Sequence, residues 1–163
     1  MATSLSRAPS FESILDTAAA AVERPRPMPA GTYDGVVRGM YEEGVSSQKK
    51  TPFVKFTYGF QSADDDVDEA ELQAILTDKD GVVHPLTEKS IKDIYYITPD
   101  ALYRLTDVLI HMGALDPDVD DGKTIRQALS ETPNASIRFT VSHRTSDDGQ
   151  QIFAEVKRTM KPE

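Results

Sequence analysis

The sequence predicts a small, mainly β domain with one long helix packed on it, preceded by a helical arm. Three observations lead to this expectation. Residues 52–60 alternate apolar and polar side chains with a period of two, which is typical of a strand with one buried face. Residues 137–156 show the same alternation on both sides of an Asp-Asp-Gly turn. Residues 98–113 instead carry apolar side chains at helical spacing.

The composition limits the chemistry that the chain can perform. Its 163 residues suit one domain and a short additional segment. The sequence contains no cysteine, which excludes disulfides, thiolate catalysis, zinc–thiolate sites and iron–sulfur clusters. The net charge is −9, but six acidic residues are concentrated between Asp64 and Glu71. The rest of the surface can therefore still carry a positive groove.

The N-terminal residues predict an amphipathic helix that stands apart from the domain. Ser10 is suited to cap a helix that ends near Val22, and the run 23–29 alternates prolines that favour an extended linker. Such a helix requires a partner surface, either on its own domain or on another molecule. The apolar stripe of the helix consists of Phe11, Ile14, Leu15, Ala18, Ala19 and Val22.

Several segments of the domain read as strands, and one remains ambiguous. Residues 71–76 fit either a short helix or a strand, and residues 42–51 read as a polar loop. The residues 147–149 are expected to form a hairpin turn, and the residues 78–81 to form a turn before a short strand. The expected strands are 31–41, 52–60, 82–83, 91–97, and the closing pair with Ile137, Phe139 and Val141 facing Ile152, Ala154 and Val156.

The helix after residue 97 has clear start and stop signals. Thr98 provides a capping hydroxyl, Pro99 suits the first helical position, and Gly113 ends the helix. A second, short helix is expected at 124–130. Strands arranged around one intervening helix fit a small OB-like β-barrel in which the helix closes one end. The expected organisation is a helical arm with linker (1–27), an OB-like barrel domain (28–158) and a short tail (159–163).

No motif for catalysis, metal binding or cofactor binding is present in the sequence. The three histidines, His84, His111 and His143, have no metal-ligand spacing, and neither acidic run has the glycine and glutamate positions of a calcium loop. A glycine-rich phosphate loop and a nucleophile elbow are both missing. We therefore expect a protein that is not an enzyme and has no cofactor.

Aromatic and cationic residues alternate on the faces of the strands that are expected to point away from the core. Rings that stack on bases and cations that follow phosphates are what single-stranded nucleic acid requires. The alternative is that Phe53, Tyr96 and Phe153 lie beneath the N-terminal helix or a loop. The candidate nucleic-acid-binding residues are Lys49, Lys50, Phe53, Lys55, Lys92, Tyr96, Arg138, Arg144, Phe153 and Lys157.

The segment from Met28 to Val37 resembles the opening strand of phage-encoded single-stranded DNA-binding proteins of the OB-fold class. Residues 51–58 and residues 95–115 with the closing hairpin follow the same pattern, so that the resemblance covers about residues 28–157. It implies protection of single-stranded DNA during replication or recombination, in the cytoplasm of a host bacterium. The chain departs from the pattern at its end, because residues 157–163 are not the acidic tail that often recruits partners.

A second class of function is open at this point. The acidic balance and the helix with its proline linker also suit a phage structural or assembly (virion) protein, or another interaction protein. In that case the helix would bind a second copy or other phage proteins. A minor third option is an inhibitor that imitates DNA through its clustered carboxylates. The alanine-rich stretch 18–22 is too short for a membrane span, so we expect no membrane partner.

Overall fold

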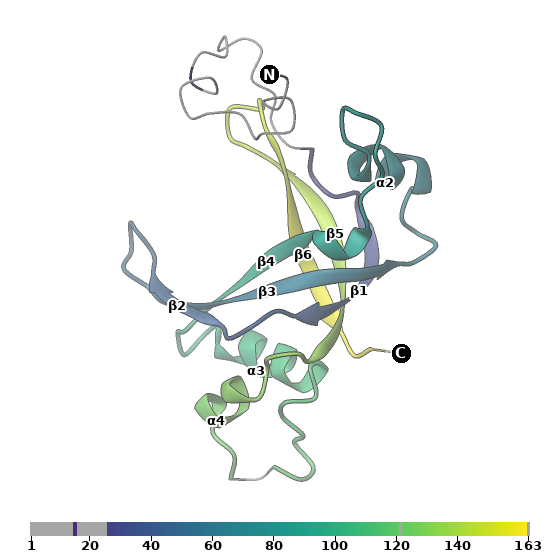
Figure 1. The fold of residues 1–163 in the computed structure, drawn as a ribbon. Helices are drawn as coiled ribbons and strands as arrows, with labels where there is room; N and C mark the ends of the chain where they lie inside the picture. Colours follow the sequence, from purple (N-terminus) through teal and green to yellow (C-terminus); the bar gives the residue numbers. More distant parts are fainter. Residues whose placement is uncertain (1–14, 16–25, 121, 163) are drawn as a thin grey trace, which may run out of the picture.

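A computed structural model describes residues 15, 26–120 and 122–162 of the chain. The predicted helix 10–22 lies outside the described residues except for Leu15, which is helical. The described elements, shown in Figure 1, are β1 (Gly31–Val37), β2 (Glu42–Val45), β3 (Pro52–Ala63), α2 (Glu69–Leu76), η3 (Leu86–Glu88), β4 (Ser90–Tyr96), α3 (Leu102–His111), α4 (Ile125–Ser130), β5 (Ser136–Thr145) and β6 (Ile152–Met160).

The strands form one antiparallel sheet with the order β2-β3-β1-β5-β6, and β4 pairs with the other edge of β3. The long strand β3 thus holds β2 and β1 one after the other along one edge. Cα atoms of β4 and β6 come within 8 Å, but no ladder joins these strands within the described chain. The mainly β fold is confirmed, whereas the sheet is open where a closed barrel was expected.

The core lies on the face of the sheet that the alternating pattern predicted. Tyr33 and Val37 of β1 are buried, and so are the inward residues of β3 and β5. The Tyr33 and Phe60 rings meet edge to face with their centroids 4.7 Å apart. Helix α3 covers this core from one end, with Leu105, Val108 and Leu109 among its buried side chains. The inward residues of β3 and β5 are Val54, Phe56, Tyr58, Phe60, Ile137, Phe139 and Val141.

The prediction of a polar loop at 42–51 was wrong for its first residues, because residues 42–45 form β2. Glu42 pairs with Lys55 and Val45 with Pro52, so the chain returns to the sheet before the loop begins. The expected strand 31–41 correspondingly ends at Val37. Gly39 has a φ of +67°, a left-handed conformation that breaks the strand and redirects the chain.

The expected strand 82–83 was also wrong. Val83 makes only an isolated bridge with Thr77. The side chain of Asp78 explains this outcome, because its Oδ1 accepts hydrogen bonds from the backbone N–H groups of Asp80 and Val82. These bonds wrap the segment into a tight turn and leave it too short to extend a ladder.

Hydrogen bonds and glycine at the ends of the helices explain where these helices begin and end. The ambiguous segment around 71–76 is helix α2, since Asp68 Oδ1 accepts a hydrogen bond from the N–H of Glu71. Thr124 and Gln127 form a capping box that starts α4. The predicted stop of α3 is confirmed by Gly113, whose φ is +77°. The expected start at Pro99 was wrong, because Thr98 Oγ1 accepts a hydrogen bond from the N–H of Ala101 in a turn that precedes the helix, and α3 begins at Leu102.

The closing hairpin differs from the expectation at both ends of β6. Ile152 was expected to face the core, but it is 55% exposed because the hairpin extends beyond the core at its turn. At the other end, β6 continues to Met160, two residues past the expected domain boundary at 158. Thr159 is therefore part of the sheet, and its Oγ1 lies 2.8 Å from Nδ1 of His111 in α3.

Candidate nucleic-acid interface

The outer sides of β3 and β4 form a continuous surface, which we call the β3–β4 face. The register places Phe53 opposite Tyr96, Lys55 opposite Ile94 and Thr57 opposite Lys92. Side chains alternate along each strand, so these six share the side of the sheet that is turned away from the core. Tyr96 and Ile94 are each 46% exposed. The predicted outward orientation of Phe53, Lys55, Lys92 and Tyr96 is confirmed.

Phe53 and Tyr96 form an aromatic platform on this face. Their ring centroids lie 6.3 Å apart, with the planes at 81°. The Phe53 ring rests directly on the backbone of the neighbouring strand β2. A Cβ atom added at Gly44 would lie 2.5 Å from Cζ of Phe53, so glycine at this position makes room for the ring. The Phe53 ring is therefore closely packed on β2, and the Tyr96 ring beside it is half-exposed.

Two lysines of the face share one carboxylate. Glu42 of β2 places Oε2 3.3 Å from Nζ of Lys55 and 3.7 Å from Nζ of Lys92. The hydrogen bond from Lys55 and the positive charge of Lys92 hold the pKa of Glu42 below its ordinary value. This ionised carboxylate therefore lies between the two ammonium groups and offsets part of their charge.

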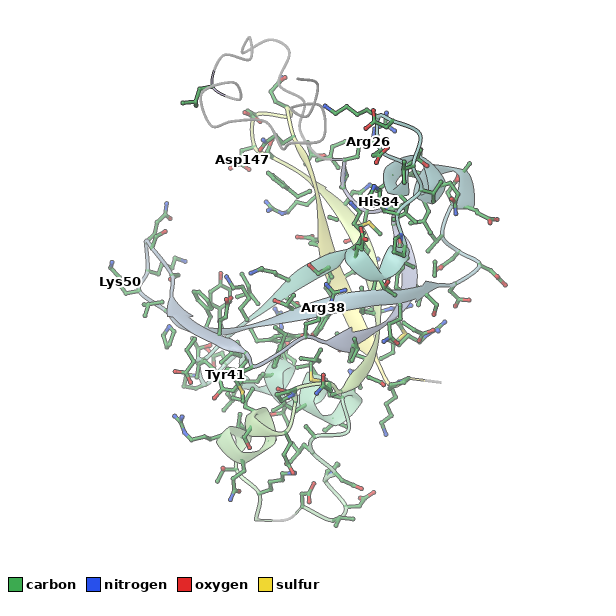
Figure 2. All side chains as sticks on the ribbon, in the orientation of Figure 1. Arg26, Arg38, Tyr41, Lys50, His84 and Asp147 are labelled. Carbon is green, nitrogen blue, oxygen red and sulfur yellow. The ribbon has the colours of Figure 1, made fainter. Side chains whose placement is uncertain are left out.

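One end of the face opens into a hollow of about 550 Å³ beneath the β2–β3 loop. Lys49 and Tyr96 line it together with Ser46 and Thr98. Lys50 lies at the tip of the same loop, where Figure 2 shows it projecting away from the sheet. The predicted loop lysines thus lie beside the aromatic platform, with Lys49 close to it and Lys50 farther out.

The other end of the face opens into a hollow of about 430 Å³ between β4 and the start of β6. Lys92 and Phe153 both line it, which brings together residues 61 positions apart in the sequence. Arg144 of β5 lies with its guanidinium carbon 5.2 Å from the Phe153 ring centre, and its Nε is 3.2 Å from Oε2 of Glu155. Phe153, with Arg144 over its ring, therefore lies beside Lys92 of β4.

The same hollow contains two cations that the sequence analysis did not select, Arg26 and Lys89. Arg26 belongs to the proline-rich linker, and Lys89 immediately precedes β4. Neither residue lies within an expected strand, so the alternation of side chains along a strand does not assign it to a face of the sheet. The only signal in the sequence is their closeness to residues that do, since Lys89 lies three positions before Lys92.

Two of the predicted residues lie apart from this surface. Arg138 has a side chain only 12% exposed, with Nη1 3.2 Å from Oδ2 of Asp34 and a second ion pair to Asp64. Its guanidinium is held by the acidic residues of β1 and of the loop after β3. Lys157 is exposed where the β5–β6 register shifts, and it lines neither hollow beside β4.

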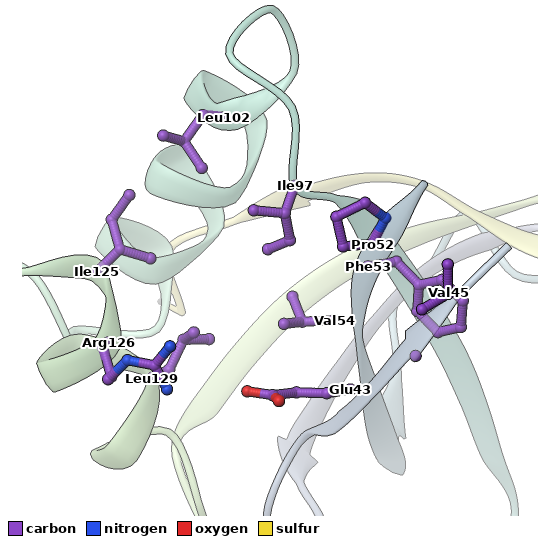
Figure 3. A pocket seen from close by; sticks show the side chains of 11 residues that line it. Glu43, Val45, Pro52, Phe53, Val54, Ile97, Leu102, Ile125, Arg126 and Leu129 are labelled. Atoms are coloured by element: carbon purple, nitrogen blue, oxygen red, sulfur yellow. The ribbon is translucent and has the colours of Figure 1, made fainter. Parts of the chain in front are cut away.

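A third hollow, of about 650 Å³, is mainly apolar and lies between the β2–β3 hairpin and helices α3 and α4 (Figure 3). Val45 and Phe53 line it from the sheet side, and Leu102 and Ile125 from the helices. Phe53 thus touches both this hollow and the β3–β4 face. The charged residues at its edge are Glu43 and Arg126.

Within the described ranges, no group of three or more histidine, aspartate or glutamate side chains is arranged to hold a metal ion. The helices described here are all too short or too polar to span a bilayer. No family model matches the chain, and no curated protein matches it either.

Proposed function

We propose that this chain is a non-enzymatic protein that binds single-stranded DNA on the β3–β4 face, without sequence preference. The observation that supports the proposal best is the combination of an aromatic platform, Phe53 and Tyr96, with lysines at both of its sides. Base stacking on such rings contributes about 1–3 kcal/mol per base and tolerates any base, because every base has a π-face. Lysines along the same path follow the phosphates.

The arrangement of strands supports the OB-like part of the proposal. If β1 and β2 count as one bent strand, β3 and β4 become the second and third strands, and α3 follows the third. In OB folds the face of strands two and three binds oligonucleotides, together with the first and last hairpin loops. Here the corresponding loops are residues 46–51 and 146–151, and their hairpins project on either side of β4 (Figure 1).

We propose that this activity serves phage DNA replication or recombination in the host cytoplasm, where single-stranded DNA requires protection. This part of the proposal follows from the resemblance of residues 28–157 to phage single-stranded DNA-binding proteins. The overall charge of −9 does not prevent it, because the acidic residues that hold Arg138 lie on β1 and the loop after β3. Phosphate binding depends on local cations.

Fluorescence anisotropy with labelled oligo-dT and with a duplex of equal length tests the proposal. We expect micromolar or tighter binding of oligo-dT at low salt, weaker binding of the duplex, and a steep loss of affinity for both as salt increases. Equal and salt-independent affinity for the two, or no binding of oligo-dT at low salt, would contradict the proposal.

The apolar hollow between the β2–β3 hairpin and α3–α4 favours a second candidate function, an assembly or interaction protein. Apolar hollows with charged edges suit protein partners better than nucleic acid. Light scattering after size exclusion separates the two candidates. A large homo-oligomer that does not bind oligo-dT supports assembly, and a monomer that binds oligo-dT supports the first proposal.

A further inference from the structure

We propose that the N-terminal segment 10–22 of the same chain docks on the β3–β4 face as an amphipathic helix. The docked segment would cover the aromatic platform and so compete with nucleic acid for it. The competition rests on the proposed function, whereas the docking itself does not.

The place where the chain enters the fold favours this docking site. Arg26 lines the same hollow as Lys92 and Phe153, so the linker begins at one end of the β3–β4 face. The four residues from Val22 to Arg26 span at most about 14 Å. The helix predicted for residues 10–22 is about 20 Å long, and the seven residues of β4 span about 23 Å. A helix that returns along β4 therefore reaches Tyr96 without a longer linker.

Exposed apolar groups on both partners support the same conclusion. The face and the adjoining hairpin expose Ile94 (46%), Ile152 (55%) and Phe153 (39%). Ile94 and Ile152 are aliphatic and are not needed for stacking on bases, so an apolar partner accounts for their exposure better than nucleic acid does. Leu15, which belongs to the apolar stripe of the segment, is 67% exposed in the structure. Docking would bury apolar surface on both sides.

The charges of the two partners are complementary. Residues 10–23 contain Glu12, Asp16 and Glu23 and no lysine or arginine. Glu12 and Asp16 are four positions apart, so a helix presents them on one side. The face and its two hollows provide Lys49, Lys55, Lys89 and Lys92. An acidic amphipathic helix can therefore place its stripe on Ile94 and Tyr96, with its carboxylates toward the lysines.

Cross-linking of the full-length chain tests the docking, because the sequence has no native cysteine. One variant combines Leu15→Cys with Ile94→Cys, and a matched control combines Leu15→Cys with Tyr103→Cys. Tyr103 is 59% exposed but belongs to α3 and to neither strand of the face. With a short bismaleimide, we expect a cross-link within one chain for the first pair and several-fold less for the control.

Three results of this experiment would overturn the docking proposal. They are the absence of a 15–94 cross-link, equal cross-linking of both pairs, and cross-links that appear only between two copies. Circular dichroism shows whether both double variants keep the fold of the parent chain. As a second measurement, Ile14→Ser removes part of the apolar stripe without changing the face, and it should reduce the 15–94 cross-link several-fold. An unchanged cross-link in that variant would also contradict the proposal.

Added oligo-dT separates this inference from the proposed function. If both are correct, oligo-dT suppresses the 15–94 cross-link, and Ile14→Ser binds oligo-dT several-fold more tightly than the parent chain. A 15–94 cross-link in a chain that does not bind oligo-dT supports the docking and refutes the DNA-binding function. Binding of oligo-dT without any 15–94 cross-link refutes the docking alone.

Discussion

Glu42 is the residue that most directly limits the charge of the β3–β4 face, since its carboxylate contacts both Lys55 and Lys92. Glu42→Gln removes the negative charge and keeps the size of the side chain. We expect this variant to bind oligo-dT several-fold more tightly at low salt, because both ammonium groups become available to phosphate. Fluorescence anisotropy measures the change. Glu43→Gln, on the same strand but facing the apolar hollow, is the control; an equal gain in both variants would contradict the role of Glu42.

Asp93 is a carboxyl group on the core side of β4, and its protonation links stability to pH. Burial raises its pKa to about 6, although the hydroxyls of Tyr58 and Tyr95 donate hydrogen bonds that oppose the shift. As the pH rises, the folded chain therefore keeps the proton of Asp93 up to a higher pH than the unfolded chain does. This contribution to the stability is fully present below about pH 4 and is lost as the pH rises through 6.

The Asp93→Asn variant cannot ionise, so it should avoid this loss. A difference of about two pKa units corresponds to about 3 kcal/mol, which sets an upper limit for the gain at pH 7. We expect the variant to be more stable than the parent chain at pH 7, with a much smaller difference at pH 4.5. Urea denaturation at the two pH values measures this. The same difference at both would show that Asp93 does not titrate in this range.

At the scale of elements, the β2–β3 hairpin positions the platform through Gly44. An alanine there would place its Cβ 2.5 Å from the Phe53 ring, so the ring must move from its position on β2. We expect Gly44→Ala to weaken oligo-dT binding, by no more than Phe53→Ala does, and to leave the fold intact. Gly122→Ala is the matched control, because a Cβ added there meets no atom within 4 Å. Unchanged affinity in Gly44→Ala would show that the position of Phe53 is unimportant.

The sequence predicted those elements whose pattern is repeated over many residues. The alternation in β3 and β5 and the helical spacing of apolar residues in α3 identified the core and the outward face, because period and parity are local properties. Strand β2 was missed, since Glu42–Val45 is short and polar and becomes a strand only by pairing with β3. Helix α2 stayed ambiguous because its cap, Asp68, lies in an acidic run that hides it.

The sequence was enough to predict which side chains of the site face outward. It was not enough to predict which of these side chains contact one another. Phe53 and Tyr96 were correctly expected to face outward, yet their pairing depends on the register between two strands about 40 residues apart in sequence. Arg138 was selected by the same parity rule. Its partner Asp34 lies 104 positions away, so no local pattern shows that its guanidinium is already held by carboxylates.

For the whole molecule, the distribution of charge matters more than the total of −9. Binding to single strands releases counterions, with a slope of log affinity against log salt of about −0.7 for each phosphate neutralised. Lys92→Ala should therefore reduce the magnitude of this slope by about 0.7. Lys79→Ala, in the exposed turn after α2, should leave it unchanged. Anisotropy titrations at four salt concentrations provide the slopes, and equal slopes in the two variants would exclude Lys92 from the interface.

Stacking of bases on the β3–β4 face is tested most directly by comparing two exposed tyrosines. Tyr96 lies on the face, and Tyr103 lies on α3 with the Arg104 guanidinium carbon 5.7 Å from its ring centre. Both are surface rings beside other side chains, so Tyr96→Ala and Tyr103→Ala differ mainly in location. We expect Tyr96→Ala to lower oligo-dT affinity by about 5- to 150-fold, and Tyr103→Ala to retain the affinity of the parent chain. Parent-like affinity in Tyr96→Ala, or an equal loss in both, would contradict binding on this face.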